Sequence, residues 1–164
     1  MKAIVKRTTP FLIVTAGVLL ILFGVVANRY DRLLESPGDA PLPTSIAGLQ
    51  LTDFSLGKDA VGEITKLHRE AFPLTSGSTG AYGDGREILV WSSGTVNRLS
   101  AAKMVSTMRD AIKTGASPFT PVREVMSEGR PIYQLVGLGQ QNYYFQSDAY
   151  VIWLAVDSAY ADQA

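Results

Sequence analysis

An uninterrupted apolar run near the start of the chain constrains this protein more than any other feature. Residues Phe11 to Ala27 carry no charged side chain over seventeen positions. With the residues just before it, the run provides about 20 residues, or roughly 30 Å of helix, which is enough to cross the hydrocarbon core of a bilayer. We therefore predict a transmembrane helix over residues 10–28.

The charges on either side of this run predict its orientation. Three basic residues and no acidic residue precede it, whereas Arg29 and Arg32 on the far side are interspersed with Asp31 and Glu35. Basic residues are enriched on the cytoplasmic side of membrane helices. We therefore expect residues 1–9 in the cytoplasm and a single-pass protein of the inner membrane, with its C-terminal part in the periplasm.

A cleaved secretory signal peptide is the alternative interpretation of the same run. Val25 and Ala27 would supply the small residues that precede a cleavage site before Asn28. The apolar core of a signal peptide usually has roughly 7–15 residues, and the longer run here favours a retained anchor.

A proline and two glycines recur every seven positions along the predicted membrane helix, at Pro10, Gly17 and Gly24. Such residues let a second helix approach closely, so we predict a packing face for the helix of another integral membrane subunit. Glycine is also common in membrane helices that have no such partner, and that interpretation stays open.

Residues 29–44 contain Pro37, Pro41 and Pro43 and show little periodicity, which predicts an extended stalk. Residues 45–164 have the alternating and helical patterns of an α+β domain. The patterns predict an antiparallel sheet with two helices packed on one of its faces. The predicted helices cover residues 58–72 and 97–114, and the predicted strands cover residues 48–54, 86–92, 120–126, 131–138, 141–146 and 150–156.

Two stretches of the domain share short sequence motifs in the same order. A Pro-x-Thr at 73–75 recurs 45 residues later, and a Gly-Arg at 85–86 recurs 44 residues later. This self-similarity suggests a duplicated helix–hairpin unit. Turn chemistry can produce the same letters without duplication.

A cluster of aromatic residues near the C-terminus is the most suggestive surface feature. Alternation along a strand sends Tyr143 and Phe145 to one face and Tyr144 to the other. Both faces can be buried only if both are covered, and exposed aromatic residues otherwise form interfaces. The candidate interface residues are Tyr143, Tyr144, Phe145, Tyr150 and Trp153.

Composition excludes several classes of site. From Ala40 onward there are ten basic and twelve acidic residues, so the domain lacks the basic surface expected for nucleic-acid binding. The absence of cysteine excludes disulfides, Cys-ligated zinc and iron–sulfur clusters. The single histidine, His68, could in principle join Met104, Met108 or Met126 at a haem or copper site, but nothing fixes a second ligand. We therefore predict no metal or cofactor.

Two motif fragments resemble those of penicillin-binding enzymes: Ser100-x-x-Lys103 and Lys113-Thr114-Gly115, with Ser147-Asp148 as half of a third. Their order and spacing differ from that family, and helix capping explains them. Gly80, Gly83 and Gly85 precede a strand rather than a helix, and Gly137 and Gly139 lack a third glycine, so neither set predicts a phosphate loop.

Several short segments resemble uncharacterised bacterial membrane-anchored proteins. They are Ile46–Thr52, Leu67-His68, Phe72–Thr75, Tyr82-Gly83, Leu89–Trp91, Tyr144-Phe145 and Val151–Leu154. The layout also resembles the single-helix accessory subunits of membrane electron-transfer complexes, such as alternative complex III. This resemblance implies no activity.

We therefore predict a non-catalytic, membrane-tethered interaction domain that serves as an accessory subunit of a membrane protein complex. The alternative is a free-standing extracytoplasmic sensor or small-ligand-binding domain. An enzyme that uses Ser100 or His68 comes third.

Overall fold

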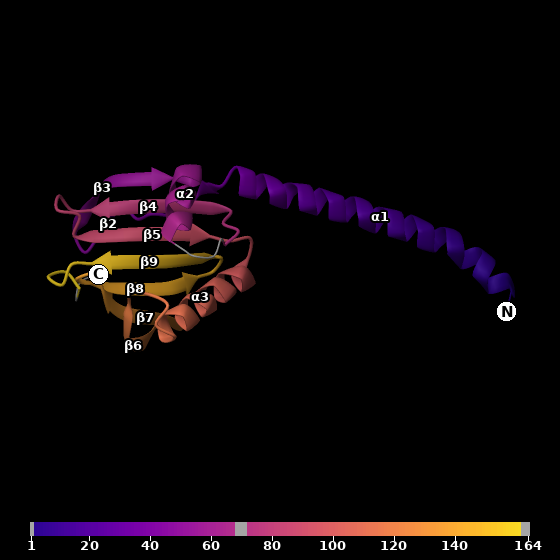
Figure 1. The fold of residues 1–164 in the computed structure, drawn as a ribbon. Coiled ribbons are helices and arrows are strands. Elements are labelled where there is room, and N and C mark those ends of the chain that lie inside the picture. Colours follow the sequence, from indigo (N-terminus) through magenta and orange to yellow (C-terminus); the bar gives the residue numbers. More distant parts are fainter. Residues whose placement is uncertain (1, 68–71, 162–164) are drawn as a thin grey trace. The chain divides into compact units, whose positions relative to one another are not determined.

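The computed structural model describes residues 2–67 and 72–161, which form three helices and a nine-stranded sheet. The chain divides into two compact units, Met1–Glu35 and Ser36–Ala164 (Figure 1). The helices are α1 (Lys2–Glu35), α2 (Gly57–Leu67) and α3 (Arg98–Lys113). The strands are β1 (Gly38–Asp39), β2 (Ser45–Ile46), β3 (Leu49–Leu56), β4 (Ser76–Tyr82), β5 (Ile88–Gly94), β6 (Thr120–Ser127), β7 (Arg130–Gly137), β8 (Gln140–Ser147) and β9 (Tyr150–Val156).

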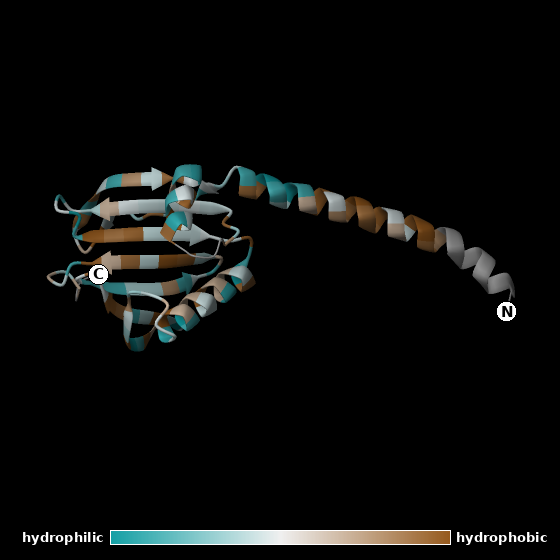
Figure 2. Cartoon of the chain, in the orientation of Figure 1, coloured by the Kyte–Doolittle hydropathy of each residue, from teal (hydrophilic) through white to brown (hydrophobic). Residues whose placement is uncertain are grey.

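Helix α1 makes up the first unit and extends beyond the predicted segment 10–28 at both ends. Among the described residues it is the one helix long and apolar enough to cross a membrane, a test that a secretory signal sequence also passes. Its only polar side chain between Phe11 and Ala27 is Thr15, whose Oγ1 donates a hydrogen bond to the Phe11 carbonyl at 2.9 Å. Figure 2 shows polar residues gathering toward Glu35.

Residues 29–44 do not form the predicted extended stalk. Residues 29–35 continue α1, since they contain no glycine or proline that would end a helix. Residues 38–44 belong to the folded domain: β1 pairs in parallel with β4, and Tyr82 Oη donates a 2.8 Å hydrogen bond to the Pro43 carbonyl. Pairing with a strand 38 residues further along the chain cannot be predicted from local sequence patterns.

The sheet has the strand order β2-β3-β4-β5-β9-β8-β7-β6, with every neighbouring pair antiparallel and β1 beside β4. Four strands from β6 to β9 form a meander that returns to β5. Helix α3 carries the chain from β5 at the centre to β6 at the edge. Thus β5 and β9, which Figure 2 shows as largely apolar, lie in the middle of the sheet.

Both α2 and α3 pack on the same face of the sheet, as predicted, because their buried residues share one core cluster (Figure 1). Ile64 of α2 is buried there, whereas Leu67 of the same helix is 65% exposed. Helix α3 buries five residues: Ala101, Met104, Val105, Met108 and Ile112.

Both termini of α3 are capped. Asn97 has an extended backbone, and its Oδ1 accepts a 2.9 Å hydrogen bond from Ser100 N. Gly115 follows the helix at φ +75°, a left-handed conformation that glycine adopts without strain. Its N–H donates to the Ile112 carbonyl at 3.1 Å, so the last turn is closed.

An aromatic row crosses the sheet beneath the helices. The register places Tyr133 opposite Tyr144, Tyr144 opposite Trp153, and Trp153 opposite Trp91. The Tyr133 and Tyr144 rings stack at 4.8 Å, and the Tyr144 and Trp153 rings at 5.4 Å. Directly opposed aromatic side chains stabilise neighbouring strands, so this row ties four strands together.

The predicted duplication is not supported. Both helix–hairpin stretches exist, but the matched letters occupy different positions in their turns. Arg86 is a left-handed residue within the longer β4–β5 turn, whereas Arg130 begins β7 after a two-residue turn in which Glu128 and Gly129 are left-handed. In addition, β4 is mostly buried and β6 is exposed throughout.

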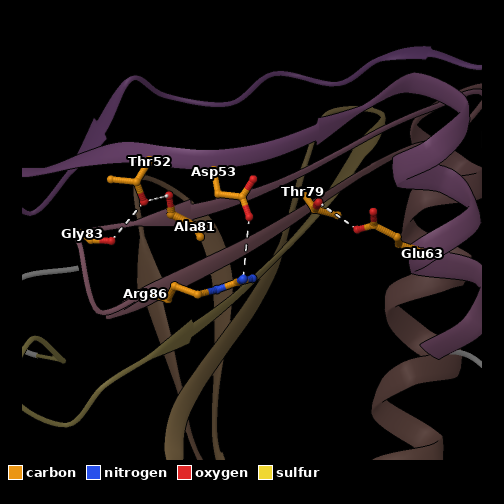
Figure 3. A network of polar contacts seen from close by, with 7 residues as sticks. All are labelled: Thr52, Asp53, Glu63, Thr79, Ala81, Gly83 and Arg86. Atoms are coloured by element: carbon orange, nitrogen blue, oxygen red, sulfur yellow. Dashed lines mark hydrogen bonds and ion pairs between the residues drawn. The ribbon is translucent and has the colours of Figure 1, made fainter.

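A polar network fixes the β3 edge of the sheet (Figure 3). The register shifts between Leu51 and Asp53, and the extra residue, Thr52, donates through Oγ1 to the carbonyls of Ala81 at 3.2 Å and Gly83 at 3.0 Å. Asp53 forms an exposed 3.7 Å ion pair with Arg86. A bulge of this kind discourages edge-to-edge pairing, so we assign these contacts a structural role.

The contribution of the Asn97 cap to stability can be measured by substitution. Replacing Asn97 with Ala should lower the free energy of unfolding by about 1 kcal/mol, because the Ser100 N–H loses its acceptor. Asn97→Ser, which restores a capping oxygen, should recover most of the loss. Chemical denaturation followed by the fluorescence of Trp91 and Trp153 measures both variants, and equal stability of N97A and the wild type would contradict the cap.

Candidate functional site

The five candidate interface residues divide between the two faces of the sheet. Tyr144 and Trp153 lie on the helix side and belong to the aromatic row. Tyr143, Phe145 and Tyr150 lie on the opposite face. This division confirms the predicted alternation between Tyr144 and its two neighbours.

Tyr144 and Trp153 pack in the core beneath the helices. Tyr144 is only 1% exposed. Trp153 is partly buried and donates through Nε1 to Oδ1 of the buried Asn142 at 3.0 Å. Asn142 in turn donates through Nδ2 to the Gln140 carbonyl at 3.2 Å. A buried amide with these partners orients the indole ring within the helix-side core.

The opposite face carries an open apolar groove of about 650 Å³. It extends over five neighbouring strands, from β5 to β6, and neither α2 nor α3 covers this part of the sheet, because both pack on the other face. Its lining residues are mainly apolar: Pro41, Pro43, Ile46, Val90, Val125, Ser127, Ile132, Tyr143, Phe145, Ser147, Tyr150, Ile152 and Leu154.

Two parts of the chain form the walls of the groove. Pro41 and Pro43, which we expected in a stalk, form one wall together with Ile46, and Val125 and Ser127 of β6 form the other. Beyond the first wall, the same face is closed by a second core cluster that includes Tyr82, Ile88 and Val156. The apolar face is therefore covered by the domain's own residues at one end and open at the other.

Polar side chains flank the groove on both sides. On one side Arg123 Nε donates to Gln134 Oε1 at 2.6 Å, and Gln134 Nε2 donates to Gln141 Oε1 at 2.7 Å. On the other side the Arg130 guanidinium lies 6.0 Å from the centre of the Phe145 ring.

Arg130 is also held by two hydrogen bonds. Nη1 donates to Ser147 Oγ at 3.2 Å, and Nη2 donates to the Glu128 carboxylate at 3.2 Å. The Arg130–Glu128 pair is solvent-exposed, and such pairs contribute little to stability. The Arg130 guanidinium can therefore donate to a second carboxylate at little cost in free energy.

The structure brings no metal ligands together among the described residues. No group of three His, Asp or Glu side chains is found there. Met104 and Met108 are buried in the helix-side core, whereas Met126 is 66% exposed on an edge strand. His68 lies outside the described residues.

The fragments that resemble penicillin-binding motifs are also separated. Ser100 is in the first turn of α3 and Lys113 is its last residue, so about 20 Å of helix lies between them. Gly83 and Gly139 have φ of +82° and +80°, which turns require. Their turn geometry explains both glycines without a phosphate ligand.

Sequence reasoning missed most of the groove. Ile132, Ile152 and Leu154 line it, but each belongs to a strand whose apolar residues occupy both faces, so local sequence does not show which set is uncovered. It also missed Ser92, whose hydroxyl is fully buried and has no hydrogen-bond partner among the described residues.

The chain matches no protein-family model, and no curated protein or solved structure gives a significant match. The fold and the groove therefore define only a class: an α+β domain, preceded by an apolar helix, with one sheet face partly open.

Two buried tyrosines predict the alkaline behaviour of the domain. Burial raises the pKa of Tyr82 and of Tyr144 to about 12, and the neighbouring Tyr133 contributes to the shift at Tyr144. Above pH 10 the unfolded chain ionises these groups while the folded domain does not, so stability is complete below pH 10 and falls between about pH 10 and 12.

Each tyrosine should account for about 2–3 kcal/mol of this loss by pH 12. Denaturation at a series of pH values should therefore show a steeper alkaline decline for the wild type than for Tyr144→Phe. Identical pH dependence in the two proteins would show that Tyr144 ionises as readily in the folded state as in the unfolded state.

Proposed function

We propose that this protein is a non-catalytic binding domain, tethered by α1 at the periplasmic face of the inner membrane, and that it serves as an accessory subunit of a membrane protein complex. The observation that carries this proposal is the open apolar groove. Contiguous apolar surface in contact with water is unfavourable, and soluble domains retain it mainly where another molecule binds.

The chemistry of the groove suits recognition rather than catalysis. Aromatic side chains at its floor, such as Phe145 and Tyr150, are typical of residues that dominate binding energy at interfaces. The polar side chains at its borders resemble the rim of a protein interface. No lining residue is a charged group that could act as a general acid or base near neutral pH.

Binding of a small ligand is the second candidate, because the groove volume of about 650 Å³ lies within the usual range for ligand sites. Its open form favours a macromolecular partner, since small-ligand sites enclose most of their ligand. Saturable binding of a small molecule by the isolated protein, with no stable protein partner, would favour this second candidate.

A charge placed in the groove tests the proposed function. Val125→Lys should abolish association with a partner after gentle detergent extraction, because an ammonium group would be desolvated against apolar surface. Met126→Lys is the matched control: it lies next along the same strand, is more exposed, and does not line the groove. Native gels and mass spectrometry should show a complex for wild type and M126K, and only monomeric wild type would refute the proposal.

The membrane helix provides an independent test. A Cβ atom added at Gly17 or Gly24 would meet nothing within 4 Å, so Gly17→Leu and Gly24→Leu should not disturb the chain itself. A loss of association in these variants would therefore report a neighbouring helix. Complexes that persist unchanged in the double variant would show that this face of α1, which also includes Pro10, has no partner helix.

The tether itself is tested by the mass of the mature protein. A retained anchor predicts an intact chain that includes residues 1–27 and stays with membranes after carbonate extraction. A mature protein that begins at Asn28 and is released in soluble form would show that the apolar run is a cleaved signal, and the proposed membrane assignment would fail.

A further inference from the structure

The backbone of the groove floor restricts what can bind there. Strands β5, β9, β8 and β7 are each paired on both sides, so their N–H and C=O groups are already used within the sheet. Pro41 and Pro43 in the wall have no N–H to donate. A bound polypeptide must therefore satisfy its own backbone hydrogen bonds, as a helix does and an extended strand does not.

The free edge of β6 is a poor site for an added strand. Its register shifts between Pro121 and Arg123, and charged side chains follow at Arg123 and Glu124. Proline, bulges and charges are the features that protect edge strands from pairing. An extended peptide alongside β6 is thus disfavoured.

The dimensions of the floor match one helix. Five strands at 4.8 Å spacing give about 19 Å across the strands, and the four residue steps from Tyr150 to Leu154 give about 13 Å along them. A helix with its side chains is about 10–12 Å wide, and 19 Å corresponds to about 13 residues. The opposite face is covered in the same manner, by the apolar stripes of α2 and α3.

The charge at the β6–β7 end of the groove specifies the chemistry of that helix. Arg123 and Arg130 flank Val125 and Ile132 on the groove side of the sheet, as their register positions show. Arg123 has no carboxylate partner among the described residues. The carboxylate partner of Arg130 is the solvent-exposed Glu128. Arg123 on one side of the groove and Arg130 on the other therefore offer positive charge that is complementary to acidic side chains.

We propose that the groove binds an amphipathic helix of about three to four turns from a partner protein. The apolar stripe of this helix contacts the groove floor, and its acidic residues lie beside Arg123 and Arg130. This inference rests on the proposed function and names the partner element. The bound helix would cover the part of the second sheet face that this chain leaves open.

Site-specific photo-crosslinking in the full-length protein, in native membranes, tests the inference. The benzophenone amino acid p-benzoylphenylalanine is placed singly at Phe145, Tyr150 and Ile132, which all line the groove. Leu138, which is 76% exposed and does not line the groove, is the control position. After irradiation, mass spectrometry identifies the crosslinked residues.

The expected result is one partner segment crosslinked at residues separated by three, four or seven positions, with acidic residues in that segment and no such adduct from position 138. Adducts separated by two positions indicate a strand and overturn the inference, although the proposed function survives. Adducts to a second copy of this chain also overturn it. Adducts only to lipid, or to no polypeptide, overturn both the inference and the proposed function.

The charged flank has its own readout in the same experiment. Combined Arg123→Gln and Arg130→Gln should lower the yield of the adduct from position 145 by about fivefold, and added salt should lower the wild-type yield. Arg98→Gln, on α3 across the sheet, should leave the yield unchanged. A salt-independent yield that R123Q/R130Q does not reduce would refute the acidic character of the partner helix.

Discussion

The structure depends on covering a sheet whose central strands are apolar on both faces. Strand β9 shows the constraint most directly, because Val151 and Trp153 point to the helices while Ile152 and Leu154 point away from them. Burial of apolar surface is the main favourable term in folding, so each face needs a layer above it. Two helices supply the first layer, and short segments of the chain supply only part of the second.

The partial second layer explains the role of the segment after α1. Leu42 and Ile46 pack on the second core cluster, and the hydroxyl of Tyr82 ties Pro43 in place. The segment stops at the groove and becomes its wall. The same residues that would form a solvated stalk in isolation are therefore ordered by the apolar face beneath them, and the uncovered remainder of that face is the candidate site.

Local patterns predicted the elements well where their causes are local. The Asn97 cap, the glycine after α3 and the two-residue turn at Glu128-Gly129 follow from side-chain and backbone preferences of a few residues. The helix-side pairing of Tyr144 with Trp153 was not predicted, because register between strands depends on the whole meander.

Only part of the candidate site could be predicted from the sequence. The aromatic residues at 143–153 indicated apolar side chains on both faces of the sheet, but alternation alone does not reveal which face the chain itself covers. The prolines at 41 and 43 were attributed to a stalk, although they form a wall of the groove. The groove floor consists of strands that are hydrogen-bonded on both sides. This arrangement depends on long-range strand pairing and cannot be predicted from local sequence.

A membrane tether changes what such a groove must achieve. A single helix laid on an open sheet face buries limited surface and orders side chains on both partners, so its intrinsic affinity is expected to be modest. If α1 holds the domain in the same bilayer as an integral partner, the second contact becomes effectively intramolecular, and its effective concentration offsets the weak affinity. The anchor and the open groove thus support each other in the proposed function: without the anchor, an exposed apolar face of this kind would promote non-specific association more readily than specific binding.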